Sequence, residues 1–544
     1  SKVLIFDWIV PYIDANIEGI VQPKCIRCLL SKLFLTCYSI TLFCILGRLE
    51  CPVYPTDVVF ALDVSQDTTP QIFEQMREMV IAVVNNTQIR ESNCPVGARV
   101  AVVSYSSDTH YLIRFQDFHN KEHLLQELAK LSYQRSTIRR DTGASMRFVA
   151  RNVFKRTLPG ANVRKVAVFF SNGQSDNGDS LSTAVLEFRA FDIHPAVIAF
   201  KNIPSINRAF AIDDTRLFQV INIQPERDYT PALQKLQSCV LCYDKCKPDS
   251  SCFRAETPRP RGYVDAAFIL ENSREISPVE FRKLKDFLSA ALDGFDISAE
   301  PETSLTGDRV AVLSHAPPQF RPKTQRSPVE IEFDFLTYGS KIRMKRHIQE
   351  SIQQLNGAAA VGHAIQWTIS NIFSEAPNQR KYKAIFVVSA GETSRWDKEV
   401  LRDASLRAKC LGYALFVLSL GDEYDGVEIE ELASLPLEHH VVQLGRIHKA
   451  ELGYAVKFLK PFLRLLKSEM NKYPQAQLKR KCTSISQQRP LYGPPKRIFA
   501  VGNTMPSGAM LLDAESAFRE PTPYDFVTPG NPFSSGQQII VPGN

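Results

Sequence analysis

The sequence predicts an α/β protein with two tandem domains, each built on a doubly wound, mostly parallel sheet. Short apolar runs that fit strands buried on both faces alternate with amphipathic stretches that fit helices. This alternation is typical of βαβ units. The same order of elements occurs twice along the chain, and one strand repeats almost letter for letter, as ARVAVVS over 98–104 and DRVAVLS over 308–314. The repeat indicates duplication of one domain.

The composition is that of a folded protein with more than one domain. The chain has 544 residues, of which 44% are hydrophobic and 23% charged, and these are ordinary globular values. A net charge of +7 is small for this length, so it argues against a nucleic-acid-binding protein. Weak attraction to acidic polysaccharides or membrane surfaces remains compatible with it.

The first domain is predicted over residues 51–240. An apolar strand over 57–62 runs into Asp63, and the next helix starts at Pro70, a residue favoured in a first helical turn. The later elements follow in order: strands over 98–105 and 110–115, helices over 121–131 and 143–154, a strand over 165–170, a helix over 181–191, strands over 195–200 and 217–221, and a helix over 230–236.

The second domain is predicted over residues 263–472, beginning with a strand over 265–270. Its first helix, over 278–292, starts with a capping box, in which Ser277 is the cap and Glu280 the third helical residue. The later elements follow in order: strands over 308–314 and 329–336, helices over 342–355 and 362–373, a strand over 383–388, a helix over 398–410, a strand over 413–420, a helix over 429–435, a strand over 441–444, and a helix over 450–467.

Three segments lie outside the predicted domains. Residues 1–50 form an atypical apolar segment, for which a secretory signal, an anchor and a non-native extension all stay open. Because the chain starts with Ser1 rather than Met, we expect a fragment or a processed piece. Residues 241–262 are a Cys-rich linker. Residues 473–544 are rich in Pro, Gly, Ser and Gln, which predicts an extended, largely disordered tail.

Cysteines cluster around the linker. The candidates for disulfides are Cys239, Cys242, Cys246 and Cys252. Such a cluster favours disulfides formed in an oxidising compartment, although the CxxC spacing at its start leaves a zinc knuckle open. Four cysteines allow three pairings, so the connectivity is not determined. Cys410 is expected to be a buried free thiol. Asn85 begins an N-x-T sequon and is the candidate glycosylation site.

Polar side chains follow the strands of the first domain. Asp63, Ser65 and Asp67 alternate along one loop, so their side chains face the same way. Thr142 precedes a helix, and Asn172 follows the strand over 165–170. Ligands of open α/β sheets bind at the carboxyl ends of the strands. These oxygens therefore predict a site for a hard cation such as Mg²⁺, while the alternative is a surface loop whose polar groups cap helices.

This pattern resembles the metal-ion-dependent adhesion site of von Willebrand factor A domains. That family has Asp-x-Ser-x-Ser after the first strand, a Thr in a later loop and an Asp in a third loop. The resemblance assigns Asp63, Ser65 and Thr142 to matching positions and implies a Rossmann-like fold. Asp67 replaces the second Ser and Asn172 replaces the last Asp, so the resemblance implies that Mg²⁺ binding is weak or absent.

The second domain departs further from the same pattern. Its corresponding residues are Glu271, Ser273, Glu275, Val361 and Ala390. Two of these positions carry apolar side chains, which offer no ligand to a small ion. No metal is therefore expected in this domain.

The tandem arrangement around a Cys-rich linker, opened by CPVYPTD over 51–57, resembles the C-terminal region of type VI collagen alpha chains of the alpha-4, -5 and -6 type. The resemblance implies a secreted glycoprotein of the extracellular matrix that serves in adhesion and assembly. It implies other collagen or matrix chains and cell-surface receptors as partners, and an oligomer, without nucleic acid or stable membrane insertion. The sequence holds no Gly-X-Y repeat, so these residues do not form a triple helix.

The sequence leaves two alternatives to adhesion. A purely structural assembly scaffold, with no metal-dependent ligand, is favoured by the eroded second site. An α/β hydrolytic enzyme is the remote alternative, and we expect no enzyme. The first strands are not followed by Gly-x-Gly-x-x-Gly or a Walker motif, and the GQSDNG run over 173–178 lacks the spacing of a nucleophile elbow.

Overall fold

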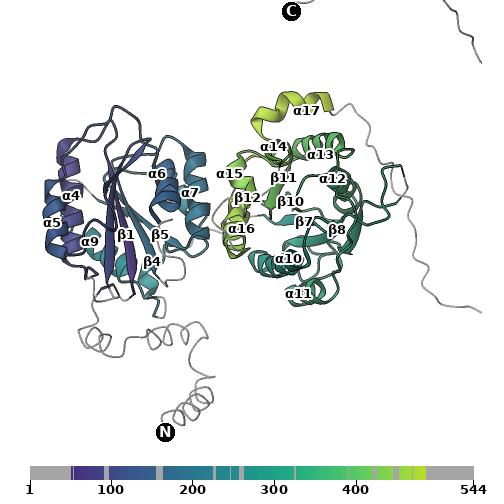
Figure 1. The fold of residues 1–544 in the computed structure, drawn as a ribbon, viewed down its shortest axis with the longest axis horizontal. Helices are drawn as coiled ribbons and strands as arrows, with labels where there is room; N and C mark the ends of the chain where they lie inside the picture. The colour runs from purple at the N-terminus through teal and green to yellow at the C-terminus, as the bar shows by residue number, and fades with distance from the viewer. Residues whose placement is uncertain are drawn as a thin grey trace, which may run out of the picture. The chain divides into compact units, whose positions relative to one another are not determined.

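The computed structural model describes residues 51–485 apart from 53, 91–96, 155–162, 224–227, 245–246, 256–261, 324–325, 390, 421–424, 445–451 and 469. Residues 1–50, Cys246, Ala390 and the tail after residue 485 lie outside the described residues, as do the expectations placed on them. The described chain contains two six-stranded sheets, one in each predicted domain (Figure 1). The predicted α/β fold with two tandem doubly wound domains is confirmed.

The first sheet has the strand order β3-β2-β1-β4-β5-β6. Its strands are β1 (Thr56–Asp63), β2 (Ala98–Tyr105), β3 (Thr109–Ile113), β4 (Arg164–Ser171), β5 (Ile193–Ala199) and β6 (Gln219–Asn222). Only the β2–β3 pair is antiparallel. Parallel strands need both faces covered, and every residue of β1 is buried, as its unbroken apolar run predicted.

Helices cover both faces of this sheet. Figure 1 shows α4 and α5 on one side of β1, and α6 and α7 on the other. The helical elements are α4 (Pro70–Asn85), α5 (Lys121–Lys130), α6 (Thr142–Phe148), η1 (Val149–Val153), α7 (Gly178–Ala190), α8 (Pro204–Phe210), α9 (Thr230–Leu236) and η3 (Gln237–Leu241). The helix predicted over 143–154 is therefore divided, because its second half is a π-helical turn. Helix α8 was not predicted, since it is only two turns long and begins directly at a proline.

The second sheet has the order β12-β11-β10-β7-β8-β9, which is the order of the first sheet read from the opposite edge. Its strands are β7 (Val264–Leu270), β8 (Arg309–His315), β9 (Val329–Phe333), β10 (Tyr382–Ser389), β11 (Tyr413–Ser419) and β12 (Val441–Gln443). Strands β8 and β9 form the antiparallel pair. The predicted duplication thus extends to the topology.

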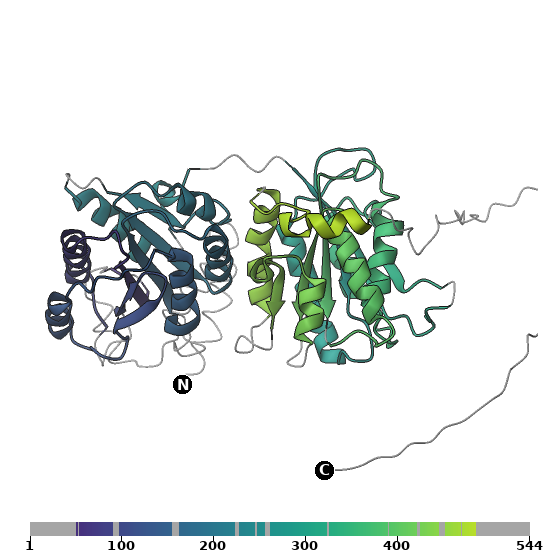
Figure 2. The same cartoon turned by 90° about the horizontal axis from the view of Figure 1, so that it is seen from above.

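The helices of the second domain surround its sheet in the same way (Figure 2). They are α10 (Pro278–Ala291), η5 (Leu292–Gly294), α11 (Lys341–Glu350), α12 (Val361–Thr368), η6 (Ile369–Phe373), α13 (Lys398–Cys410), α14 (Gly426–Leu432), α15 (Leu437–His440) and α16 (Leu452–Lys467). The capping box at Ser277 and Glu280 is present, and it satisfies two backbone N–H groups at the start of α10. Among the described residues, no helix has both the length and the apolar character needed to cross a membrane.

The repeated strand sequence places one ion pair in each sheet. Arg99 and Asp57 face each other on β2 and β1 and form two hydrogen bonds of 2.7 Å. Arg309 and Asp265 do the same on β8 and β7, at 2.7 and 2.8 Å. The planar guanidinium fits a carboxylate in this forked geometry. The arginine that both copies of the strand sequence contain therefore has the same structural role in each domain, which is to pair with an aspartate of the neighbouring strand.

Disulfides tie the ends of both domains. Cys239 pairs with Cys252, and Cys242 pairs with Cys51 at the start of the first domain. Since the two members of the CxxC motif belong to different disulfides, they do not form a zinc knuckle. The expectation of a free thiol at Cys410 was wrong, because Cys410 pairs with Cys482.

The last disulfide also corrects the expected tail. Two helical elements, η7 (Ala476–Leu478) and α17 (Lys479–Ile485), lie in the segment that was expected to be extended. Cys482 holds α17 to the end of α13, across 72 residues of sequence. The composition of this segment predicted disorder, but a long-range covalent bond orders residues that local sequence does not.

Candidate functional site

The carboxyl edge of the first sheet brings the predicted site residues together. Asp63, Ser65, Thr142 and Asn172 are fully buried, whereas the side chain of Asp67 is 46% exposed. The backbone N–H of Asn172 donates to Oδ2 of Asp63 at 2.8 Å, and its side-chain amide donates to the carbonyl oxygen of Asp67 at 2.8 Å. The loops after β1 and β4 are thereby joined. Thr142 is joined to the second loop through its N–H, which donates to Ser175.

A residue that sequence reasoning missed, Arg140, lies among these side chains. Its Nε lies 2.5 Å from Oδ2 of Asp63. Its Nη2 lies 2.8 Å from Oγ of Ser65 and 2.6 Å from Oδ1 of Asp67. Its Nη1 donates to the carbonyl oxygen of Gln174 at 3.1 Å. The guanidinium therefore contacts three of the five predicted ligands.

The charges of this cluster stabilise one another. The side chain of Arg140 is 4% exposed, and burial on its own would lower its pKa. The carboxylates of Asp63 and Asp67 more than offset this effect and hold the pKa of Arg140 above its usual value. For Asp67, burial raises the pKa, but Arg140 and the Ser65 hydroxyl outweigh it and lower the pKa. The cluster is thus a charge-assisted network at ordinary pH.

These residues do not fit a bound divalent cation while Arg140 is in place. Oδ1 of Asp63 accepts from the N–H and the hydroxyl of Ser65, and Oδ2 accepts from Arg140 and Asn172. A carboxylate offers about four lone-pair positions, so protein donors use all of them. Oγ1 of Thr142 and Oδ1 of Asn172 are buried without a hydrogen-bond partner among the described residues. Both are neutral oxygens and supply no charge to a divalent ion.

In the second domain, a buried histidine lies beside the buried carboxylate of the corresponding site. Glu271 follows β7 and is 1% exposed. Its Oε1 accepts from the N–H of Ser273 at 3.1 Å, and its Oε2 lies 3.3 Å from Nε2 of the buried His315, the last residue of β8. Burial raises the pKa of Glu271, but His315 and Ser273 outweigh that effect and lower the pKa. The sequence signal for this pair was a histidine at the end of β8.

The other predicted positions of this second site do not complete it. Glu275 is exposed, and its N–H donates to Oγ of Ser273. Val361 is buried and offers no side-chain oxygen, although its N–H donates to Thr393. Ala390 lies outside the described residues. The described part of the site therefore presents one buried carboxylate, that of Glu271, which lies 3.3 Å from the ring of His315.

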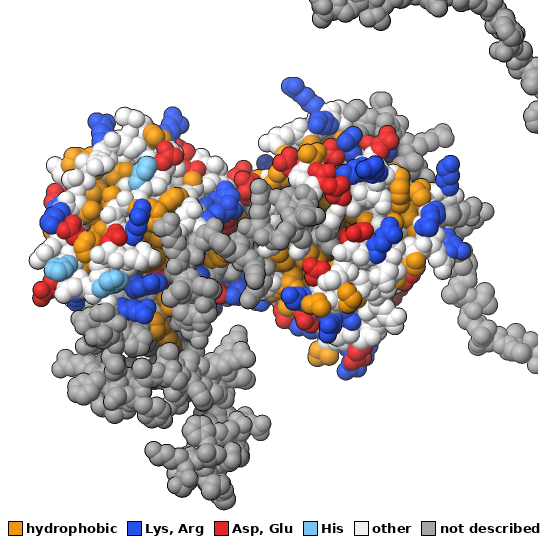
Figure 3. All heavy atoms as spheres, viewed as in Figure 1, with side chains coloured by type: hydrophobic (Ala, Val, Ile, Leu, Met, Phe, Trp, Pro, Cys, Tyr) orange, Lys and Arg blue, Asp and Glu red, His pale blue; other side chains and the backbone are white. Residues whose placement is uncertain are grey.

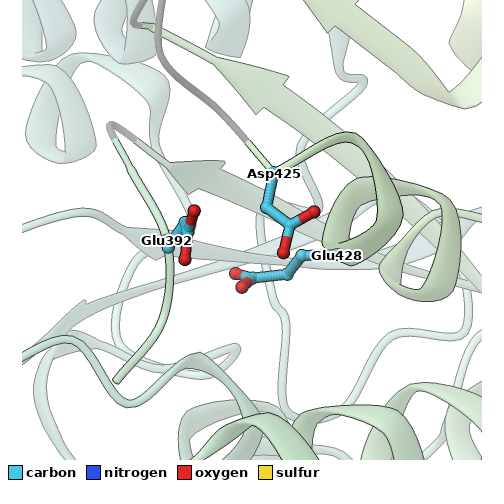
Figure 4. Close-up of side chains that lie close together, drawn as sticks. All are labelled: Glu392, Asp425 and Glu428. Atoms are coloured by element: carbon cyan, nitrogen blue, oxygen red, sulfur yellow. The ribbon is translucent and has the colours of Figure 1, made fainter. Parts of the chain in front are cut away.

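A second acidic cluster lies in the same domain and was not predicted. Oxygens of Glu392, Asp425 and Glu428 come within 4.8 Å of one another and face each other in Figure 4. Nζ of Lys398 lies 3.0 Å from Glu392, 3.2 Å from Asp425 and 3.9 Å from Glu428. Hydrogen bonds to Glu392 and Asp425 raise the pKa of Lys398. The ammonium group thus supplies the positive charge that such a cluster requires.

Two surface features bear on function. Asn85, the candidate glycosylation site, is the exposed last residue of α4, while the hydroxyl of Thr87 donates to the carbonyl oxygen of Val83. Figure 3 shows Lys and Arg interspersed with Asp and Glu on the visible face. This mixture of charges on that face agrees with the small net charge of +7.

Comparison with known proteins gives the family. The family model of the von Willebrand factor type A domain matches residues 57–220 and 265–451. Collagen alpha-6(VI) chain of Homo sapiens is 54% identical over 457 residues, which are 84% of this chain and 20% of that protein. Collagen alpha-5(VI) chain of Homo sapiens is 49% identical over 437 residues, or 80% and 16%. This chain therefore spans about a fifth of the length of the collagen relatives it matches.

More distant similarities were also found. Matrilin-1 of Mus musculus is 29% identical over 195 residues, which are 34% of this chain and 35% of that protein. A solved structure of proximal thread matrix protein 1 from the mussel byssus, described with a zinc-occupied MIDAS motif, covers 75% of this chain and 97% of its own, at 16% identity and a TM-score of 0.31.

Proposed function

This chain belongs to the von Willebrand factor type A domain family and is homologous to collagen alpha-6(VI) and alpha-5(VI) chains, and from that premise we propose that it is an extracellular matrix protein that binds other proteins through its two A domains. The observation that carries the proposal is 54% identity to a type VI collagen chain across 84% of this chain. The relatives are matrix proteins rather than enzymes, which supports a binding role.

The proposed partners are other collagen or matrix chains and cell-surface receptors, and the proposed setting is the secreted, extracellular matrix. The disulfides support this setting, because such bonds persist in oxidising compartments. We also propose that the chain acts within an oligomer, as a piece of a larger assembly.

Between the two modes of binding considered, the contacts of Arg140 favour an assembly module without a metal-dependent ligand. The predicted Mg²⁺ ligands of the first domain are hydrogen-bonded to a guanidinium, and the second domain has Val361 where the pattern calls for a hydroxyl. The proposed binding of other proteins then needs no bridging metal ion at the carboxyl edge of either sheet.

The proposal is tested by surface plasmon resonance with the intact chain immobilised. Purified type VI collagen and matrilin-1 are passed over it in buffer with EDTA and in buffer with Mg²⁺. We expect saturable binding of at least one of them, with the same affinity in both buffers. The chain reduced at its disulfides and denatured is the control. Saturable binding of neither protein at concentrations up to about 10 μM, which would nearly saturate a site with a Kd of about 1 μM, would overturn the proposal.

A further inference from the structure

We propose that the guanidinium of Arg140 replaces the metal ion of the first A domain, so that the carboxyl edge of this domain is held together without a divalent cation. The inference concerns the same edge as the proposed function, but it depends on no partner. It follows from where the positive charge lies, what that charge contacts and how the surrounding chain makes room for it.

The guanidinium of Arg140 is held in place by several contacts. Three nitrogens of Arg140 reach four acceptors on two loops, including both acids of the loop after β1. Asp63 is fully buried and belongs to the strand end, so its charge needs a permanent counter-charge. A flat, forked cation that is 4% exposed provides it without any ligand from solvent.

The peptide group that follows Arg140 is also fixed, because both of its polar atoms are hydrogen-bonded. Its carbonyl oxygen accepts from the N–H of Asp176, and the next N–H, of Asp141, donates to the carbonyl oxygen of Ser106. The Asp141 side chain then caps α6 by accepting from the N–H of Ala144. These hydrogen bonds fix the position of the Arg140 backbone, and so they fix the direction in which its side chain extends from the loop.

Gly173 provides the space for the guanidinium. A Cβ atom at this position would lie 2.8 Å from Nη1 of Arg140, closer than carbon and nitrogen can approach. At Gly391, the corresponding glycine of the second domain, a Cβ atom would meet no described atom within 4 Å. The residue corresponding to Arg140 there is Ala359. The space beside this glycine is therefore filled in the first domain, which has the arginine, and open in the second domain, which does not.

A metal ion at this place would have to displace these contacts. Two negative charges, from Asp63 and Asp67, face Arg140, and Nζ of Lys201 lies 3.9 Å from Asp67. The charges are close to balanced before any ion enters. A divalent ion would bring two positive charges next to a buried guanidinium whose partners it would take.

The test is binding of Mn²⁺ to the intact chain, measured by loss of the EPR signal of the free ion and checked by thermal shift. Five proteins are compared: the unchanged chain, Asp67→Ala, Arg140→Ala, Arg140→Ala with Asp63→Asn, and Arg139→Ala. The last is the matched control, because Arg139 is the exposed neighbour of Arg140. Any Mn²⁺ held by Glu392, Asp425 and Glu428 is common to all of them and cancels in the differences.

We expect the unchanged chain, Asp67→Ala and Arg139→Ala to bind Mn²⁺ equally. Arg140→Ala should gain about one site with a Kd of about 1 mM or tighter, the range of extracellular cation modules. The added Asp63→Asn should remove that site again. Mn²⁺ should raise the melting temperature of Arg140→Ala by more than that of the unchanged chain.

Two results would overturn the inference. One is a Mn²⁺ site in the unchanged chain that Asp67→Ala weakens, a comparison that holds even if Arg140→Ala does not fold. The other is a folded Arg140→Ala chain that gains no site, because Arg140 would then occupy no cation position. Neither result bears on binding of collagen or matrilin, so this test and the test of the proposed function fail separately.

Discussion

Arg140 and Asp63 are 77 residues apart in sequence, yet Nε of the arginine lies 2.5 Å from Oδ2 of the aspartate, with both side chains buried. This ion pair lies at the carboxyl edge of the first sheet. The carboxylate that the sequence predicted as a metal ligand has its counter-charge from an arginine of the same domain. In the second domain, the buried acid Glu271 lies 3.3 Å from Nε2 of His315, a residue of β8 rather than of the loop that holds Arg140 in the first domain.

Substitution of Arg140 should destabilise the first domain. Arg140→Met leaves the buried Asp63 unpaired, which should lower the free energy of unfolding by about 3–5 kcal/mol. Adding Asp63→Asn should recover part of this loss, because the unpaired charge is then gone. Chemical denaturation with hydrogen exchange of first-domain peptides measures both. Arg139→Ala should change stability by less than about 0.5 kcal/mol, and strictly additive effects of the Arg140 and Asp63 changes would contradict the pairing.

A methyl group at Gly173 should disturb the same network. Gly173→Ala places a Cβ 2.8 Å from Nη1 of Arg140, and we expect a loss of about 1–3 kcal/mol from this overpacking. Gly391→Ala is the matched control in the second domain, where the added atom has open space and should cost less than about 0.5 kcal/mol. Thermal unfolding of the two variants gives the comparison. Equal losses at both positions would show that the guanidinium does not fill the space.

The duplicated ion pairs should differ in strength. Arg309 is fully buried and also donates to the carbonyl oxygens of Pro301 and Pro377, whereas the Arg99 side chain is 22% exposed. We expect Arg309→Ala to lower the free energy of unfolding of the second domain by about 3–5 kcal/mol, since it leaves the buried carboxylate of Asp265 without its partner. Arg99→Ala should cost less in the first domain. Hydrogen exchange of strand peptides distinguishes the domains, and a larger loss for Arg99→Ala would contradict this ranking.

Acid should weaken the second domain through His440. Burial lowers the pKa of this side chain to about 3, from about 6.5 in an unfolded chain. The unfolded state therefore binds a proton that the folded state does not. The stabilising contribution is complete above about pH 6.5 and is lost as the pH falls toward 3, by up to about 1.4 kcal/mol per pH unit. His440→Phe should show a shallower fall of melting temperature between about pH 6 and pH 4. Parallel curves for the two proteins would refute this assignment.

The Cys410–Cys482 bond should protect the helix α17 from proteolysis. Lys479, Arg480 and Lys481 lie on α17, so they offer cleavage sites to trypsin once the helix is released. We expect rapid cleavage here in Cys410→Ser and slow cleavage in the unchanged chain, followed by mass spectrometry. Cys246→Ser serves as a control for loss of a cysteine elsewhere. Equal cleavage rates in all three proteins would mean that the bond does not hold α17 in place.

The sequence alone determined the architecture, because periodicity and turn chemistry act locally. The buried run of β1, the capping box at Ser277 and the repeated strand each predicted their elements in the right order. The parallel topology then placed Asp63 and Asn172 on one edge, since the carboxyl ends of parallel strands lie together. The positions of several predicted site residues could thus be derived from the chain.

Tertiary structure decided what those residues contact. Arg140 is one of several basic residues in a polar loop, and only the folded backbone carries its guanidinium to Asp63 rather than to water. The same holds for Cys410, whose partner Cys482 lies in a segment whose composition predicted an extended tail. Such contacts join positions far apart in sequence, so no local pattern encodes them. They are set by the packing of β1, β4 and α6 in the first domain and of α13 and α17 in the second, which fixes which side chains meet.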